Sequence, residues 1–175
     1  MDRSPGVRRR LAFVAAALAA AAGACGPEEE GPGVRLILET EVGVPTVVDT
    51  VDVEVTASRT ASGETCTPQV QAFPLAAPSD LPVRILYEAG PEFRSWVAFR
   101  VCWRKSGAEV RAQTVLQPVP SSGIQEVRVE LAGACLTRTC GAGEQCVAGA
   151  CTPVPSPDPF DPALRVPGID CDVPR

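Results

Sequence analysis

The run WVAFRVCWRK, residues 96–105, decides the fold of this chain. Its large apolar side chains stand on every second residue from Val97 to Trp103, and smaller or polar residues stand between them. Period two with one apolar face is typical of a half-buried β-strand, because successive side chains of a strand point to opposite faces. The turn residues 105–107 (Lys-Ser-Gly) predict a tight hairpin to the next alternating run.

The same alternation recurs between Val34 and Leu131, and turn-forming residues separate the runs. No stretch after the first 24 residues has a helical period. About seven short strands in about a hundred residues predict an all-β fold, a single antiparallel β-sandwich over residues 34–131 that is immunoglobulin-like or transthyretin-like. The expected strands are 34–38, 51–57, 69–73, 81–87, 97–103, 110–116 and 127–131, with Val110, Ala112, Thr114 and Leu116 on the apolar face of the sixth.

Four of the eight cysteines fall in the run CLTRTCGAGEQCVAGAC, residues 135–151. We call residues 132–151 the disulfide module, because so short a segment cannot bury a core of its own and needs covalent bonds to hold it. The gaps of four, five and four residues do not match the two-residue spacing of zinc knuckles. Disulfides are therefore favoured over zinc, and three pairings remain open. Its bulkiest apolar residues are Leu136 and Val147, so we expect it to add little to the sandwich core.

The first 24 residues predict an export signal. Four arginines precede an apolar segment that is too short to span a membrane permanently, and small residues lead to Cys25. This pattern resembles the signal of bacterial lipoproteins, in which the cysteine is acylated and becomes the new N-terminus, although the family prefers Leu, Val or Ile where Ala22 stands. A plain secretory signal cut after Ala24 is the alternative. The resemblance, with Gly26 in place of an aspartate, implies that a lipidated Cys25 and a tether over residues 25–33 hold the protein at the outer membrane.

Composition excludes several functions. The chain has no histidine, which removes the usual general base and the commonest zinc ligand, and no other residue pattern predicts a catalytic, metal or cofactor site. Removal of the signal takes away four of 16 basic and one of 21 acidic residues and leaves a net charge of −8. So acidic a protein is not expected to bind nucleic acid.

The whole chain resembles small lipoproteins of outer-membrane bacteria in which a β-sandwich precedes one C-x2-G-x2-C-x2-G-x-C module, here residues 140–151. That resemblance carries no catalytic residues. The module also resembles a miniature EGF-like module, whose interleaved order implies the pairs Cys135–Cys146 and Cys140–Cys151.

The other cysteines leave an odd number. Cys66 and Cys102 both fall in the predicted sandwich and are the expected third pair. If Cys25 is acylated, one of the seven remaining cysteines stays unpaired, and Cys171 is the candidate. Cys171 lies in the tail, residues 152–175, whose many prolines predict an extended and poorly ordered segment.

A basic face is the one candidate binding surface in the sandwich. It comprises Trp96, Arg100, Arg104 and Arg111, expected opposite the apolar positions and suited to a glycan or an acidic polymer. An ordinary solvated sheet face explains the same residues, because charged side chains are mostly exposed.

The sequence therefore predicts a non-enzymatic lipoprotein that binds or displays an envelope protein or a surface polymer. One alternative is a secreted protease inhibitor, since small disulfide-bonded loops resist proteolysis and Arg138 would suit a protease cleft. A histidine-free extracellular enzyme is a second alternative, which the missing general base disfavours.

Overall fold

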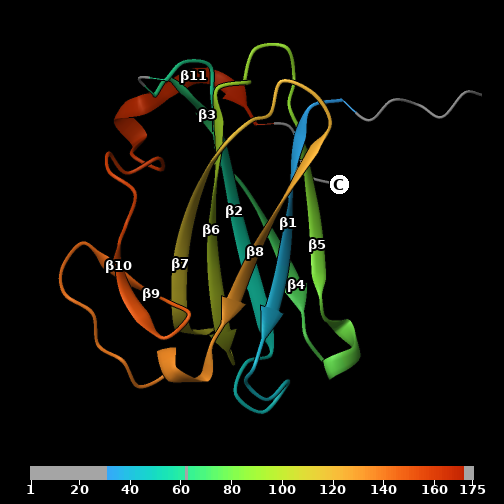
Figure 1. The fold of residues 1–175 in the computed structure, drawn as a ribbon, viewed down its shortest axis with the longest axis vertical. Coiled ribbons are helices and arrows are strands. Elements are labelled where there is room, and N and C mark those ends of the chain that lie inside the picture. The colour runs from blue at the N-terminus through green and yellow to red at the C-terminus, as the bar shows by residue number, and fades with distance from the viewer. Residues whose placement is uncertain (1–30, 62, 172–175) are drawn as a thin grey trace, which may run out of the picture.

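The computed structural model describes residues 31–61 and 63–171 and has the predicted all-β fold (Figure 1). The predicted signal peptide 1–24, Cys25 and most of the tether lie outside the described residues. Within the described ranges, no helix is long and apolar enough to cross a membrane.

Two sheets pack as a sandwich. The smaller sheet has the order β5-β1-β8, and the larger has the order β11-β3-β2-β6-β7 with β4 also paired to β2. Most pairs are antiparallel, but β1–β8 and β3–β11 are parallel. A hairpin of β9 and β10 lies beside β7 (Figure 1). The strands are β1 (Gly33–Thr40), β2 (Thr50–Ser58), β3 (Thr65–Thr67), β4 (Gln69–Pro74), β5 (Val83–Glu88), β6 (Trp96–Lys105), β7 (Ala108–Pro118), β8 (Ile124–Leu131), β9 (Glu144–Val147), β10 (Ala150–Pro153) and β11 (Arg165–Asp170).

The core lies between the two sheets, and the alternating residues of β6 lie at its centre. These side chains are fully buried and pair in register with the buried valines of β2. Each such burial contributes roughly 1.5–3 kcal/mol. The fully buried members on these two strands and β1 are Val34, Leu36, Leu38, Val51, Val53, Ala57, Val97, Phe99, Val101 and Trp103.

The apolar face predicted for β7 is wrong. Val101 of the core pairs with Gln113, so from residue 111 to 117 the odd-numbered residues of β7 share the inner face and the even-numbered residues share the outer one. Gln113 is 2 % exposed, whereas Leu116 is 40 % exposed. The reason is that the disulfide module covers the inner face of β7 and offers it hydrogen-bonding groups as well as apolar atoms.

The tail is ordered as far as the structure describes it, which corrects the expectation of a disordered segment. After a 3-10 turn at Pro162–Leu164, β11 pairs in parallel with β3, and Cys171 donates its backbone N–H to Thr67 O. Phe160 is 3 % exposed. The six prolines between residues 153 and 167 therefore do not prevent the described part of the tail from packing.

The disulfides confirm two predicted pairs and correct the third. Cys135–Cys146 and Cys140–Cys151 form as the EGF-like resemblance implies, but Cys66 pairs with Cys171. Cys102 is a free thiol, because it alternates with the core residues of β6 and so lies on the outer face of its sheet, whereas Cys66 is buried in the core. Three disulfides place the chain in an oxidising compartment.

The module contributes more to the core than its sequence predicts. Cys135 is 0 % exposed and Cys146 is 1 % exposed, and both belong to the same buried cluster as the sandwich valines. The expectation from Leu136 and Val147 overlooked that a disulfide is itself a bulky apolar group when it is buried.

Candidate functional site

The predicted basic face does not form a free binding surface. Arg100 on β6 pairs with Glu54 of β2 at 3.1 Å and with Asp158 of the tail at 3.2 Å. Its guanidinium also lies 4.2 Å from the centre of the Phe160 ring, which is within cation–π range. The tail itself therefore occupies the position that the sequence suggested for an external ligand.

The other three residues of the predicted basic face either bind groups of the protein itself or lie on different faces. Arg104 donates from Nε to Asp52 and from Nη1 to Gly107 O at 3.1 Å. The hydrogen bond to Asp52 holds the pKa of Arg104 above its ordinary value. Trp96 is half-buried at the start of β6, and Arg111 lies on the inner face of β7 opposite Trp103. The four residues are thus not one face.

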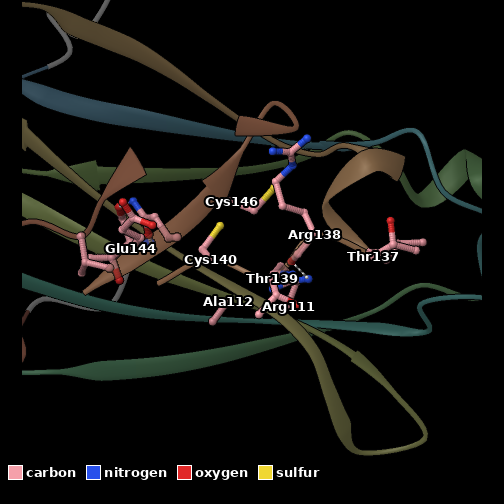
Figure 2. Close-up of a pocket in the computed structure, with 12 residues that line it drawn as sticks. Arg111, Ala112, Thr137, Arg138, Thr139, Cys140, Glu144 and Cys146 are labelled. Carbon is pink, nitrogen blue, oxygen red and sulfur yellow. Dashed lines mark hydrogen bonds between the residues drawn. The ribbon is translucent and has the colours of Figure 1, made fainter. Parts of the chain in front are cut away.

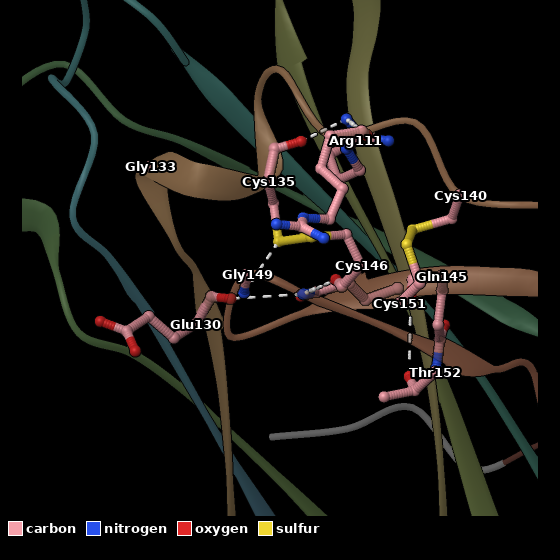
Figure 3. Close-up of a disulfide and its surroundings, with 12 residues drawn as sticks. Arg111, Glu130, Gly133, Cys135, Cys140, Gln145, Cys146, Gly149, Cys151 and Thr152 are labelled. Carbon is pink, nitrogen blue, oxygen red and sulfur yellow. Dashed lines mark hydrogen bonds between the residues drawn. A yellow bond between two sulfur atoms is a disulfide. The ribbon is translucent and has the colours of Figure 1, made fainter.

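Arg111 instead fixes the loop of the module that runs from residue 136 to residue 140, which we call the Arg138 loop. Its Nη2 donates to Cys135 O and, at 3.0 Å, to Arg138 O. Two disulfides close the loop at its ends, since Cys135 precedes it and Cys140 is its last residue (Figure 3). One arginine and two covalent bonds therefore hold five residues in place.

Two glutamines attach the module to β7. Gln113 of β7 donates from Nε2 to Cys146 O at 2.7 Å and to Glu130 O of β8 at 3.3 Å (Figure 3). In the other direction, Gln145 of β9 accepts from Thr114 N at 2.6 Å and donates to Thr114 O at 2.8 Å. The carboxamide of Gln145 thus takes the place of a neighbouring strand at the edge of the sheet.

Glycines shape the hairpin that carries Gln145. Gly143 and Gly149 have φ angles of 76° and 79°, which is the left-handed region that glycine adopts without a steric cost. Gly149 also donates its N–H to Cys135 Sγ at 3.4 Å. The glycine inside each cysteine loop therefore meets a backbone requirement, as the spacing predicts.

Between the Arg138 loop and β7 lies a groove of about 390 Å³ (Figure 2). Figure 2 shows Ala112 and Arg111 of β7 on one side, and Arg138, Thr139 and Cys140 of the loop on the other. Glu144 closes one end, where its carboxylate accepts from Gly141 N at 2.9 Å. The groove is lined by Arg111, Ala112, Thr114, Leu136, Thr137, Arg138, Thr139, Cys140, Glu144, Gln145, Cys146 and Val154.

The lining of the groove is mixed. It contains hydroxyls, a carboxylate, guanidinium groups and apolar atoms, and no aromatic residue. Among the described residues, no group of three or more histidine, cysteine, aspartate or glutamate side chains could hold a metal ion. The free thiol of Cys102 is half-buried, and this burial raises its pKa, so the thiol is protonated and a weak nucleophile at neutral pH.

No protein-family model, curated protein or solved structure matches this chain. The groove is therefore identified from its geometry alone. Arg111, Arg138 and the cysteines were predicted to matter from the sequence, but for other roles, and Gln113 and Gln145 were not predicted. The sequence offers one signal for these two residues. Gln113 stands in an alternating strand and Gln145 stands next to a cysteine, and both are neutral hydrogen-bonding side chains.

Proposed function

We propose that this protein is an envelope-anchored, non-enzymatic lipoprotein that binds a partner in the groove between the disulfide module and β7. The sandwich is the scaffold, and the module presents the Arg138 loop on it. The partner is an envelope protein or a surface polymer. The lipid anchor is proposed at Cys25, on the outer membrane, from the signal-like run that precedes it.

The observation that carries this proposal is that both walls of the groove are fixed before any ligand arrives. The β7 wall belongs to a sheet, and the opposite wall is held by two disulfides and by Arg111. A preformed site loses little conformational freedom on binding, and this favours affinity.

The anchor is tested by metabolic labelling with a radioactive fatty acid. We expect the wild-type protein to carry the label and to fractionate with the membrane, and we expect Cys25→Ser to lose the label and become soluble. Unlabelled wild-type protein in the medium would show that the run is a plain secretory signal.

The binding site is tested by cross-linking and capture from envelope extract. Thr139→Trp fills the groove from the exposed loop, and Ser122→Trp adds the same side chain to an exposed turn between β7 and β8. We expect Thr139→Trp to lose the partner and Ser122→Trp to keep it. A partner that both variants retain would move the site to another surface.

A second candidate is a protease inhibitor, because Arg138 is exposed on a loop that two disulfides and Arg111 restrain. One contact opposes it. The carbonyl of Arg138 accepts a hydrogen bond from Arg111, whereas a residue bound in a serine protease must direct that carbonyl into the oxyanion hole. A panel of arginine-specific proteases separates the two functions, because inhibition by wild type that Arg138→Ala abolishes would favour the inhibitor.

A further inference from the structure

The groove contains an open segment of a sheet edge. β7 is the last strand of its sheet. From residue 111 to 117, its odd-numbered residues direct their backbone N–H and C=O groups toward β6, in the same alternation as Val119, whose N–H donates to Ser95 O. The even-numbered residues therefore direct their N–H and C=O groups outward. Thr114 confirms this direction, because both of its backbone groups bind Gln145. Ala112, two residues earlier, has the same place in the alternation and lines the groove, so its two backbone groups are expected to point the same way.

Gln145 indicates what kind of group fits beside Ala112. Its carboxamide presents an acceptor oxygen and an N–H donor side by side, and both contacts with Thr114 are 2.8 Å or shorter. The N–H and C=O groups of one residue in an extended chain also lie on the same side, so such a residue can make the equivalent pair of bonds to Ala112. The accessible edge is short, since Gln145 blocks it on one side and the register shift between Trp103 and Arg104 ends the regular pairing on the other.

The positive charge of Arg138 at the rim of the groove favours one kind of extended chain over others. Most arginines in the described ranges have an acidic or carbonyl partner within the protein, but the structure shows none for the guanidinium of Arg138. Arg138 is exposed at the rim of the groove. An unpaired guanidinium on an otherwise acidic protein attracts a carboxylate.

We propose that the groove binds an extended acidic segment of a partner polypeptide, which adds to the edge of β7 at Ala112 and places a carboxylate near Arg138. This inference rests on the proposed binding function and names its ligand class. A glycan is less suited, because none of the residues that line the groove is aromatic and sugar rings favour aromatic platforms.

The test uses the full chain in detergent and fluorescein-labelled pentapeptides, acetylated and amidated, of alternating valine and threonine with a central glutamate. Companion peptides carry glutamine or lysine at the centre, or N-methyl groups that remove the backbone donors. We expect the glutamate peptide to bind, N-methylation to weaken binding about tenfold per lost hydrogen bond, and the lysine peptide to bind more weakly than the glutamine peptide.

Protein variants complete the test. Arg138→Gln should weaken the glutamate peptide about two- to fivefold, as expected for an exposed ion pair, and should leave the glutamine peptide unchanged. Arg84→Gln is the matched control, because Arg84 is also exposed but lies on β5 in the other sheet. Thr139→Trp should abolish binding of all peptides.

Three results would overturn the inference. They are equal binding of the glutamate and lysine peptides, equal loss in Arg84→Gln and Arg138→Gln, and tight binding of the N-methylated peptide. If no peptide binds while wild type still captures a Thr139→Trp-sensitive partner from envelope extract, the ligand class is wrong and the proposed function stands. If that capture also fails, the proposed function fails with it.

Discussion

The disulfide module and the tail both cover the larger sheet, but they cover opposite faces of it and are held by different forces. The module meets the inner face and the edge of β7 through neutral carboxamides that bind backbone groups. The tail meets the outer face of β6 through Arg100, which binds a carboxylate and an aromatic ring. Buried backbone groups need a partner at every moment, whereas partly exposed charges can turn to water. The module is therefore held to β7 mainly through backbone groups, and the stretch of the tail around Asp158 and Phe160 through a charged side chain, while β11 and Cys171 join the end of the tail to the sheet and the core.

The disulfides of the module and of the tail also differ, in the length of chain that each one closes. The two module disulfides each join residues 11 apart, and Cys66–Cys171 joins residues 105 apart. In the chain-entropy model the long loop is worth about 5 kcal/mol and each short loop about 3 kcal/mol. The tail thus has the bond with the larger entropic contribution, in addition to its strand pairing with β3, and the module has two bonds with smaller contributions.

The largest expected effect comes from ending the chain at Gly133. From sequence alone, this shortened chain is expected to stay within about 2 kcal/mol of the full chain, because little apolar area is removed. The structure predicts instead that it loses cooperative unfolding, because Cys135, Cys146 and all three disulfides are lost and the inner face of β7, with Gln113, loses the module that covers it. Denaturant melts decide between the two.

A chain that ends at Pro153 is the control for that experiment, since it keeps the module with its two disulfides and loses β11 and the Cys66–Cys171 disulfide. We expect it to unfold cooperatively at lower denaturant. If the chain ending at Gly133 also gives one sharp transition, the module is an appendage and the comparison between module and tail is wrong.

The second effect is the loss of single disulfides. The double variant Cys66→Ser with Cys171→Ser should lower the free energy of unfolding by about 5 kcal/mol, and Cys140→Ser with Cys151→Ser by about 3 kcal/mol. Urea melts at matched temperature give both values. An equal or reversed order would show that local packing, and not loop length, sets the contribution of each bond.

The third effect tests the carboxamide of Gln113. Gln113→Ala should cost about 1–3 kcal/mol, because Cys146 O and Glu130 O lose their donor inside the protein. Gln117→Ala is the matched control on the same face of β7, where Gln117 only accepts a bond from the exposed Gln125. Similar melting temperatures for the two variants would contradict a special role for Gln113.

The smallest effect is the contact between Arg100 and Phe160. A double-mutant cycle of Arg100→Met and Phe160→Leu should give a coupling energy of about 0.5–1 kcal/mol at this partly exposed site. Coupling that disappears in the Cys66→Ser, Cys171→Ser variant would confirm that the disulfide places the tail. Coupling above about 2 kcal/mol would instead give the tail an attachment as strong as that of the module.

Sequence reasoning succeeded where one physical effect dominates. The strands from Val97 to Trp103 and from Val51 to Ala57 were predictable because apolar burial enforces a period of two. The module disulfides were predictable from a resemblance, and short loops left few alternatives. It failed where distant segments meet. Nothing near Cys66 indicates that Cys171 approaches it.

The prediction of which residues of β7 face the core failed for a different reason. Gln113 is buried and polar, so its burial depends on a partner that hydrophobic periodicity does not reveal. The groove depends on that same arrangement, because Arg111 and Gln113 place the module against the strand. A candidate site built from such contacts becomes visible only when the fold is known.

The bond between Cys66 and Cys171 closes a ring of peptide chain that runs through β4 to β11 and includes every residue of the groove. A ring cut once remains one piece. A single proteolytic nick in any exposed turn between those cysteines therefore releases no fragment, and the nicked chain keeps both walls of the groove joined. In the presence of proteases, the groove therefore keeps its two walls connected after one cut in its backbone.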